Sequence, residues 1–191
     1  EDFGALAERY LGDRARRFEI AEFNRMDEAR PGRAVAIPMS PFNPGGVEPA
    51  SFQTIPILCY HRFGPRPSSM TITAPSFEAQ MRYLAQNGYT VIAMAKLFDF
   101  LEGKVALPRK TVVITIDDGY RSTYDIAWPI LRKYNFPATV FLYTDFVGAP
   151  DALTWPQMKE MTSGGLIDIQ PHSKTHSNLT MKLADENDAR Y

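Results

Sequence analysis

The chain has 191 residues, 45% of them apolar and 12% aromatic, which is enough for one ordinary domain with a small appendage. Its 21 basic and 22 acidic side chains give a net charge of −1, so composition provides no basic surface for nucleic acid or an anionic membrane. No apolar run approaches the ~18–20 residues that cross a bilayer, and we expect neither a nucleic-acid partner nor a transmembrane segment.

The single cysteine, Cys59, excludes an internal disulfide and a zinc site built from several cysteines. Because it stands between Leu58 and Tyr60, we expect it to be a small core residue rather than a nucleophile.

Residues 1–39 predict a small helical segment. Three apolar residues at the spacing of one helix face indicate a first helix: Leu6, Tyr10 and Leu11. Residues 18–24 suggest a second short helix, and a turn at 31–33 leads into a predicted strand at 34–38. Residues 40–53 are rich in proline and glycine without periodicity, which is typical of a linker.

From residue 54 onward, predicted strands and helices alternate. Strands are predicted at 55–60, 89–92, 111–116, 138–143 and 166–170, and helices at 75–86, 94–101, 124–134 and 153–162. The segment at 111–116 is nearly all β-branched and apolar, which is typical of a strand covered on both faces. The alternation predicts a parallel α/β domain, either barrel-like or doubly wound.

Two adjacent carboxylates, Asp117 and Asp118, follow the strand at 111–116 and precede Gly119. Parallel α/β folds bind their ligands at the carboxyl ends of strands. Neighbouring carboxylates repel each other unless a cation or a shared proton offsets the repulsion. One aspartate can therefore ligate a metal while the other faces substrate. The alternative is an ordinary loop in which an aspartate caps the next helix.

Two of the three histidines, His172 and His176, follow the strand at 166–170. A spacing of four places them on one face of a helical turn, where two imidazoles can bind one metal. A pair of solvated histidines at a helix start is the alternative. Because both motifs follow predicted parallel strands, we expect them to converge at one edge of the sheet.

Both motifs resemble those of the polysaccharide deacetylase (NodB-like) family. The segment Thr115-Ile116-Asp117-Asp118-Gly119 is similar to its first motif, with Ile116 in place of the commoner Phe, and His172-Ser173-Lys174-Thr175-His176 matches its second. Segments at 57–63, 137–142 and 153–155 also resemble family segments, so the match spans about residues 55–183. The resemblance implies a (β/α) barrel of the NodB-like type, incomplete at the C-terminus of this chain and preceded by the small helical segment.

The resemblance also implies roles for individual residues. Asp117 corresponds to the general base, and the metal ligands correspond to Asp118, His172 and His176. Ser173 corresponds to a residue that supports the histidine loop by hydrogen bonding. His61 stands where some members place a histidine near the active site, although a core or loop histidine is the alternative. The expected cofactor is a divalent metal, zinc in many members, with cobalt or nickel also able to occupy such sites.

Residues 1–39 resemble a LysM-like module that lacks its first strand, a family that binds chains containing N-acetylglucosamine. A helical extension packed on the main domain is the alternative. The expected organisation is a LysM-like or helical segment at 1–39, a linker at 40–53, and the N-terminal part of a deacetylase catalytic domain at 54–191.

The implied function is metal-dependent hydrolysis of the N-acetyl group of N-acetylglucosamine units in a cell-envelope polysaccharide, in an extracellular or periplasmic location. Peptidoglycan is favoured if the LysM-like segment is real, and poly-N-acetylglucosamine is the other substrate. Two alternatives stay open. The chain could be a carbohydrate-binding protein with a vestigial catalytic half, or a metal hydrolase that acts on a small amide.

The family's general-acid histidine, arginine motif and acetate-pocket motif are not found before Tyr191, where a charged helix is predicted at 185–188. We therefore expect a truncated chain with weak or no deacetylase activity on its own. Robust acetate release by the purified chain would contradict this expectation.

Overall fold

The computed structural model describes residues 2–40, 44–48 and 51–178, which form two compact units. One unit comprises Glu1–Ile57 and Leu84–Val113, and the other comprises Leu58–Tyr83 and Ile114–Tyr191, as far as these are described. The charged helix predicted at 185–188 lies outside the described residues. Within the described ranges, every helix is too short or too polar to span a bilayer.

The first unit begins with the two predicted helices, α1 (Phe3–Leu11) and α2 (Arg17–Asn24), joined by a 3-10 turn, η1 (Arg14–Arg16). The Asp2 carboxylate accepts a hydrogen bond from the Ala5 amide at 2.6 Å, which satisfies a free donor at the start of α1. The buried side chains of Phe3, Ala7 and Ile20 form the core between the helices.

The strand predicted at 34–38 does not form. The Asn24 side chain instead donates to the Ala36 carbonyl at 2.7 Å and accepts from the Ala36 amide at 2.9 Å. One side chain thus satisfies both backbone groups of Ala36, which a partner strand would otherwise pair. The LysM-like module is therefore not confirmed. The proline- and glycine-rich region contains a short turn, η2 (Pro44–Gly46), and a two-residue ladder between β1 (Val47–Glu48) and β2 (Ser51–Phe52).

The rest of the first unit pairs β6 (Thr90–Ile92) in parallel with the first three residues of β7 (Thr111–Asp118), and α4 (Met94–Leu101) follows β6. One buried cluster joins these elements: Ile92, Leu97, Phe100, Leu107 and Val113. The predicted strand–helix–strand order is confirmed here.

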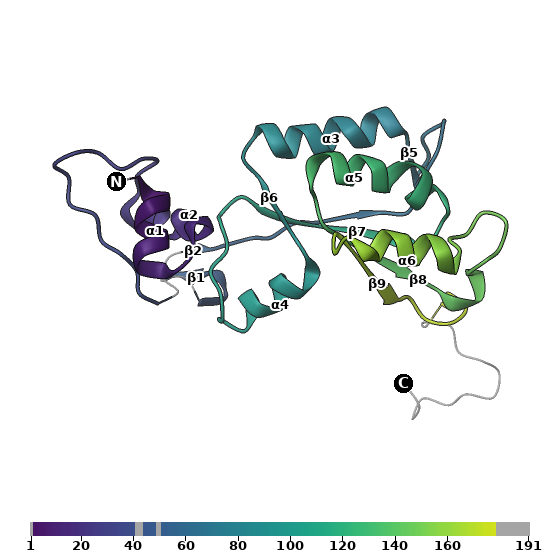
Figure 1. Cartoon of the computed structure of the whole chain (residues 1–191). Helices are drawn as coiled ribbons and strands as arrows, with labels where there is room; N and C mark the ends of the chain where they lie inside the picture. The colour runs from purple at the N-terminus through teal and green to yellow at the C-terminus, as the bar shows by residue number, and fades with distance from the viewer. Residues whose placement is uncertain (1, 41–43, 49–50, 179–191) are drawn as a thin grey trace, which may run out of the picture. The chain divides into compact units, whose positions relative to one another are not determined.

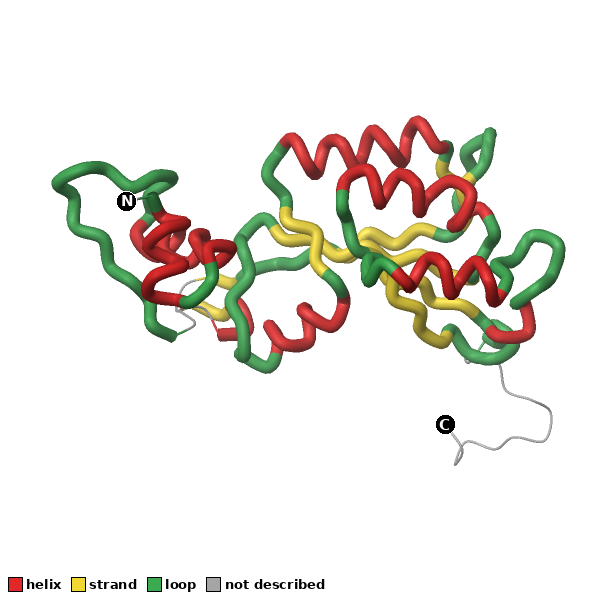
Figure 2. The backbone as a smooth tube through the Cα atoms, viewed as in Figure 1, coloured by secondary structure: helices red, strands yellow, loops and turns green. Residues whose placement is uncertain are grey.

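In the second unit, β3 (Ile57–Tyr60), β7, β8 (Ala138–Leu142) and β9 (Ile167–Pro171) follow one another in the sheet. The β7–β8 and β8–β9 pairs are parallel, as predicted. Figure 2 shows the alternation of helices and strands. Closure into a barrel is not seen among the described residues and stays a prediction.

Helices connect these strands. Helix α3 is Ala74–Gln86, a π-helical turn η3 (Thr123–Ala127) leads into α5 (Trp128–Tyr134), and α6 is Trp155–Ser163. Figure 1 shows α3 and α5 next to each other, and the Lys133 ammonium of α5 donates to the Glu78 carboxylate of α3. Two short segments, β4 (Arg62–Phe63) and β5 (Thr71–Ile72), form a separate parallel ladder.

The strand predicted at 55–60 forms over its second part as β3, and it is not buried. In β3, Leu58 and Tyr60 are half-buried, whereas Ile57 and Cys59 are exposed. β3 stands at the end of the described strand order, so a neighbouring strand covers it on one side only. By contrast, β7 lies between neighbours, and its residues from Thr111 to Ile116 are all buried.

A reciprocal capping box begins α6. The Gln157 amide donates to Thr154 Oγ1 at 3.4 Å, and the Thr154 amide donates to Gln157 Oε1 at 2.9 Å. We expect Thr154→Ala to lower the free energy of unfolding by about 1 kcal/mol, measured by urea denaturation. Ser163→Ala, at the exposed end of the same helix, is the matched control and should change it by no more than about 0.5 kcal/mol. Equal losses in the two variants would contradict the capping role.

Candidate active site

The two carboxylates lie at the carboxyl end of β7, as its last two residues rather than just beyond it. Successive side chains of a strand point to opposite faces, so Asp117 and Asp118 join different groups of side chains. Asp117 lies beside Cys59 and His61, and Asp118 lies beside the two histidines that follow β9. The structure thus separates the carboxylates into two adjacent sites, which agrees with the expectation of two distinct tasks.

Backbone strain is concentrated around these residues. Among the described residues, five non-glycine residues have positive φ, and three of them lie here: Asp118 (74°), Ser173 (65°) and His176 (56°). The other two, Arg25 and Asn135, end helices, where a left-handed residue is ordinary. A left-handed non-glycine residue costs about 1–2 kcal/mol, and such strain clusters at functional sites.

The histidine motif is an irregular loop, so the predicted helical turn is wrong. The His172 amide donates to the Leu142 carbonyl at 2.7 Å, and the Asp145 amide donates to the Lys174 carbonyl at 3.0 Å, which ties the loop to the end of β8. Ser173 Oγ accepts from the His176 amide at 3.0 Å and closes the loop on itself. Left-handed backbone at Ser173 and His176, rather than helical periodicity, brings the two rings to a centroid distance of 5.0 Å.

Three side-chain atoms that can bind a metal face one another where this loop meets the end of β7. Asp118 Oδ1 lies 3.3 Å from His176 Nε2 and 3.9 Å from His172 Nε2, and one ligand atom from each residue lies within 4.8 Å of the other two. Asp118 Oδ1 is buried and accepts no hydrogen bond from the described residues. An unsatisfied buried carboxylate oxygen is costly, and a cation would offset the cost. One carboxylate and two imidazoles are ligands that divalent transition metals accept, so these residues fit a metal.

Asp117 has a different environment. Its Oδ2 accepts a hydrogen bond from the Cys59 thiol at 3.4 Å and lies 3.8 Å from His61 Nε2. Partial burial raises the pKa of the Cys59 thiol, a hydrogen bond with Thr115 lowers it, and the charge of Asp117 raises it. The prediction that Cys59 is a core residue is wrong, because β3 exposes it next to a carboxylate.

Sequence reasoning missed three aromatic side chains near the histidines: Tyr120, Tyr143 and Phe146. Tyr143 packs on His176 at a centroid distance of 5.3 Å and stacks on Phe146 at 5.1 Å, and Tyr120 meets Phe146 edge-on at 5.3 Å. Burial raises the pKa of the Tyr143 phenol, and the charges of Tyr120 and Asp118 raise it further. Tyr120 and Tyr143 come directly after Asp118-Gly119 and after β8, so their places at strand ends were the available signal.

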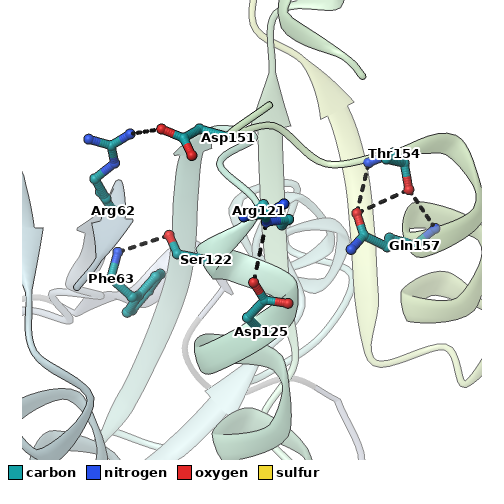
Figure 3. Close-up of polar contacts among 8 residues, drawn as sticks. All are labelled: Arg62, Phe63, Arg121, Ser122, Asp125, Asp151, Thr154 and Gln157. Carbon is teal, nitrogen blue, oxygen red and sulfur yellow. Dashed lines mark hydrogen bonds and ion pairs between the residues drawn. The ribbon is translucent and has the colours of Figure 1, made fainter. Parts of the chain in front are cut away.

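Hydrogen bonds to a segment that is distant in the sequence hold the turn after β7 in place. The Leu153 amide donates to the Gly119 carbonyl at 2.9 Å, and the Arg121 amide donates to the Asp151 carbonyl at 2.7 Å. Figure 3 shows the Arg62 guanidinium pointing to the Asp151 carboxylate, 3.1 Å away, and the Phe63 amide pointing to Ser122 Oγ. These contacts fix the turn that follows both carboxylates.

Comparison with known proteins agrees with this geometry. The polysaccharide deacetylase family model matches residues 104–190, which include both motifs. YxkH of Bacillus subtilis, which is named a putative polysaccharide deacetylase, is 37% identical over 125 residues. This region of the chain belongs to the polysaccharide deacetylase family. The Asp-Asp-Gly turn at the end of β7 and the histidine loop after β9 both lie within the matched residues, and β8 stands between the two strands.

Other members of the family match the same region. A poly-β-1,6-N-acetyl-D-glucosamine N-deacetylase of Staphylococcus aureus is 30% identical over 115 residues, which is 58% of this chain. The solved structure of IcaB from Ammonifex degensii superposes with a TM-score of 0.60 at 35% identity over 63% of this chain.

The matches are partial on both sides. The B. subtilis match covers 65% of this chain and 44% of that deacetylase, and the chain spans 39% of the S. aureus protein and 53% of the IcaB chain. The family and the fold of the matched region follow from these comparisons.

Proposed function

We propose that this chain carries the metal-binding and general-base part of an enzyme that hydrolyses the N-acetyl group of N-acetylglucosamine units in a cell-envelope polysaccharide. The observation that carries the proposal is the buried Asp118 Oδ1, which has no hydrogen-bond donor among the described residues and has two histidine nitrogens within 3.9 Å. The adjacent Asp117, which faces other side chains, supplies a second carboxylate for proton transfer.

The metal ligands in this proposal are Asp118, His172 and His176. Zinc is the favoured metal, and cobalt or nickel suit the same ligands. When bound, the cation would polarise the amide carbonyl and lower the pKa of the attacking water. Ser173 keeps the second histidine in place through the His176 amide.

Asp117 is the proposed general base. Its carboxylate takes the proton of the attacking water, and its side chain is 19% exposed, so that water can reach it. His61 lies 3.8 Å from Oδ2 and the Cys59 thiol donates to the same oxygen, so these two neighbours orient the carboxylate. We assign His61 a positioning role in this site.

The proposed substrate is a glycan with N-acetylglucosamine units, and the location is the cell envelope. The name of the S. aureus relative favours a β-1,6-linked polymer of N-acetylglucosamine over peptidoglycan. The preference for peptidoglycan depended on the LysM-like segment. Residues 34–38, which were expected to supply its strand, do not form one. Aromatic rings at Tyr120, Tyr143 and Phe146 give the site apolar faces against which sugar rings can pack.

Metal content tests the proposal. Each protein is mixed with one equivalent of zinc and then dialysed. The unsubstituted chain should retain about one zinc per chain. Asp118→Ala and His172→Ala should each retain almost none, because each substitution removes a proposed ligand. His61→Ala is the matched control for the histidine variant and should retain the metal. Unchanged zinc stoichiometry in both ligand variants, measured by atomic absorption, would rule out the metal assignment.

A further inference from the structure

A second group of metal-ligating side chains lies next to the proposed metal site and shares none of its residues. It consists of Cys59, His61 and Asp117, whose ligand atoms all lie within 4.8 Å of one another. Alternate residues of an extended chain point to the same side, and Cys59 and His61 are two residues apart at the end of β3. The neighbouring strand β7 presents Asp117 to them.

The distances suit a tetrahedral cation. With bond lengths of about 2.3 Å to sulfur and about 2.0–2.1 Å to nitrogen or oxygen, tetrahedral ligand atoms stand about 3.3–3.6 Å apart. Cys59 Sγ lies 3.4 Å from Asp117 Oδ2, and His61 Nε2 lies 3.8 Å from the same oxygen. Small side-chain rotations would therefore bring both of these pairs to tetrahedral spacing.

The chemistry of the ligands selects the metal. A thiolate and an imidazole favour zinc and cadmium over magnesium and calcium, which prefer oxygen ligands. Binding displaces the thiol proton to solvent, because the thiolate is the ligand. Cys59 is exposed, so a cation can reach the group from solution and solvent can supply a fourth ligand.

We propose that Cys59, His61 and Asp117 form a second cation site for zinc or another sulfur-accepting divalent metal, and that filling this site inhibits the enzyme. The inhibition rests on the proposed function, in which Asp117 is the base. A carboxylate that is bound to a cation cannot accept the proton of water, so the same residue serves either proton transfer or the second metal. Excess zinc would thus stop a reaction that one equivalent of zinc supports.

Cadmium titration tests the site without relying on activity. We expect a chain loaded with one equivalent of zinc to develop the ultraviolet charge-transfer band of a cadmium–thiolate bond, which reports on Cys59 because the chain has one cysteine. Cys59→Ser should abolish the band. His61→Ala should raise the cadmium concentration at half-saturation at least about tenfold, since even outer-shell partners of a metal ligand contribute that much.

His172→Ala is the matched control, because it removes a histidine from the first site and should leave the band intact. A band that is absent from the unsubstituted chain, unaffected by His61→Ala or lost in His172→Ala would overturn the second site. Each of these outcomes is independent of whether the protein hydrolyses a glycan.

Inhibition is measured separately, on an active form of the protein. Acetate release should fall as zinc exceeds one equivalent, and Cys59→Ser should raise the zinc concentration at half-inhibition at least about tenfold. Equal inhibition of both proteins would refute the inhibitory role even if cadmium binds. A protein that releases no acetate at any zinc concentration would instead refute the proposed function and leave the cadmium result standing.

Discussion

Asp117→Asn is expected to lower acetate release from N-acetylglucosamine oligomers by about 10²–10⁴-fold, the usual contribution of a general base. The amide has the shape of the carboxylate but cannot take a proton from water. Because Asp117 does not belong to the group formed by Asp118 and the two histidines, the first equivalent of zinc should stay bound. The measurements are the rate of acetate release by an active form of the protein and the zinc content of the same sample.

Asp168→Asn is the matched control, since Asp168 is an exposed residue of β9 at the opposite end of the strand from the histidine loop. Its rate should equal that of the unsubstituted protein. Loss of zinc in Asp117→Asn would assign Asp117 to the metal instead. A rate close to that of the unsubstituted protein, with zinc retained, would remove it from the reaction.

Gly119→Ala is expected to lower the free energy of unfolding by about 2–5 kcal/mol, the sum of two costs. Gly119 has φ of 82°, where a side chain costs about 1–2 kcal/mol. A Cβ at this position would also lie 2.7 Å from the Leu142 Cβ, and forcing such an overlap costs about 1–3 kcal/mol. Since single domains are stable by only about 5–15 kcal/mol, urea denaturation will resolve the loss easily.

Gly148→Ala separates the two costs. Gly148 has φ of 84°, but a Cβ there would meet no atom within 4 Å. It should therefore lose only the conformational part, about 1–2 kcal/mol. Equal losses in the two variants would show that the contact with Leu142 is not a constraint on the turn that follows the carboxylates.

The sequence by itself determined the elements whose side chains all suit the same surroundings, either buried or exposed. The run from Thr111 to Ile116 has apolar or β-branched side chains on both faces, so it predicted a strand that neighbours cover, and β7 is that strand. The alternation of strands and helices predicted the parallel sheet for the same reason. The two motifs, Asp117-Asp118 and His172 with His176, were also identifiable from residue types, spacing and family resemblance, because strand ends in such folds meet at one edge.

Tertiary structure alone decided the features that depend on partners distant in sequence. Cys59 has apolar neighbours in the chain, yet it is exposed beside Asp117 because β3 is at the end of the described strand order. The segment at 34–38 does not form the predicted strand, and the Asn24 side chain makes hydrogen bonds to the backbone of Ala36 instead.

The spacing of the two histidines in the sequence does not explain why their rings lie close together. Hydrogen bonds to the end of β8 and left-handed backbone at Ser173 and His176 replace the predicted helical turn. Spacing in the sequence therefore identified the two histidines that Asp118 meets, and long-range backbone contacts decided how they reach it.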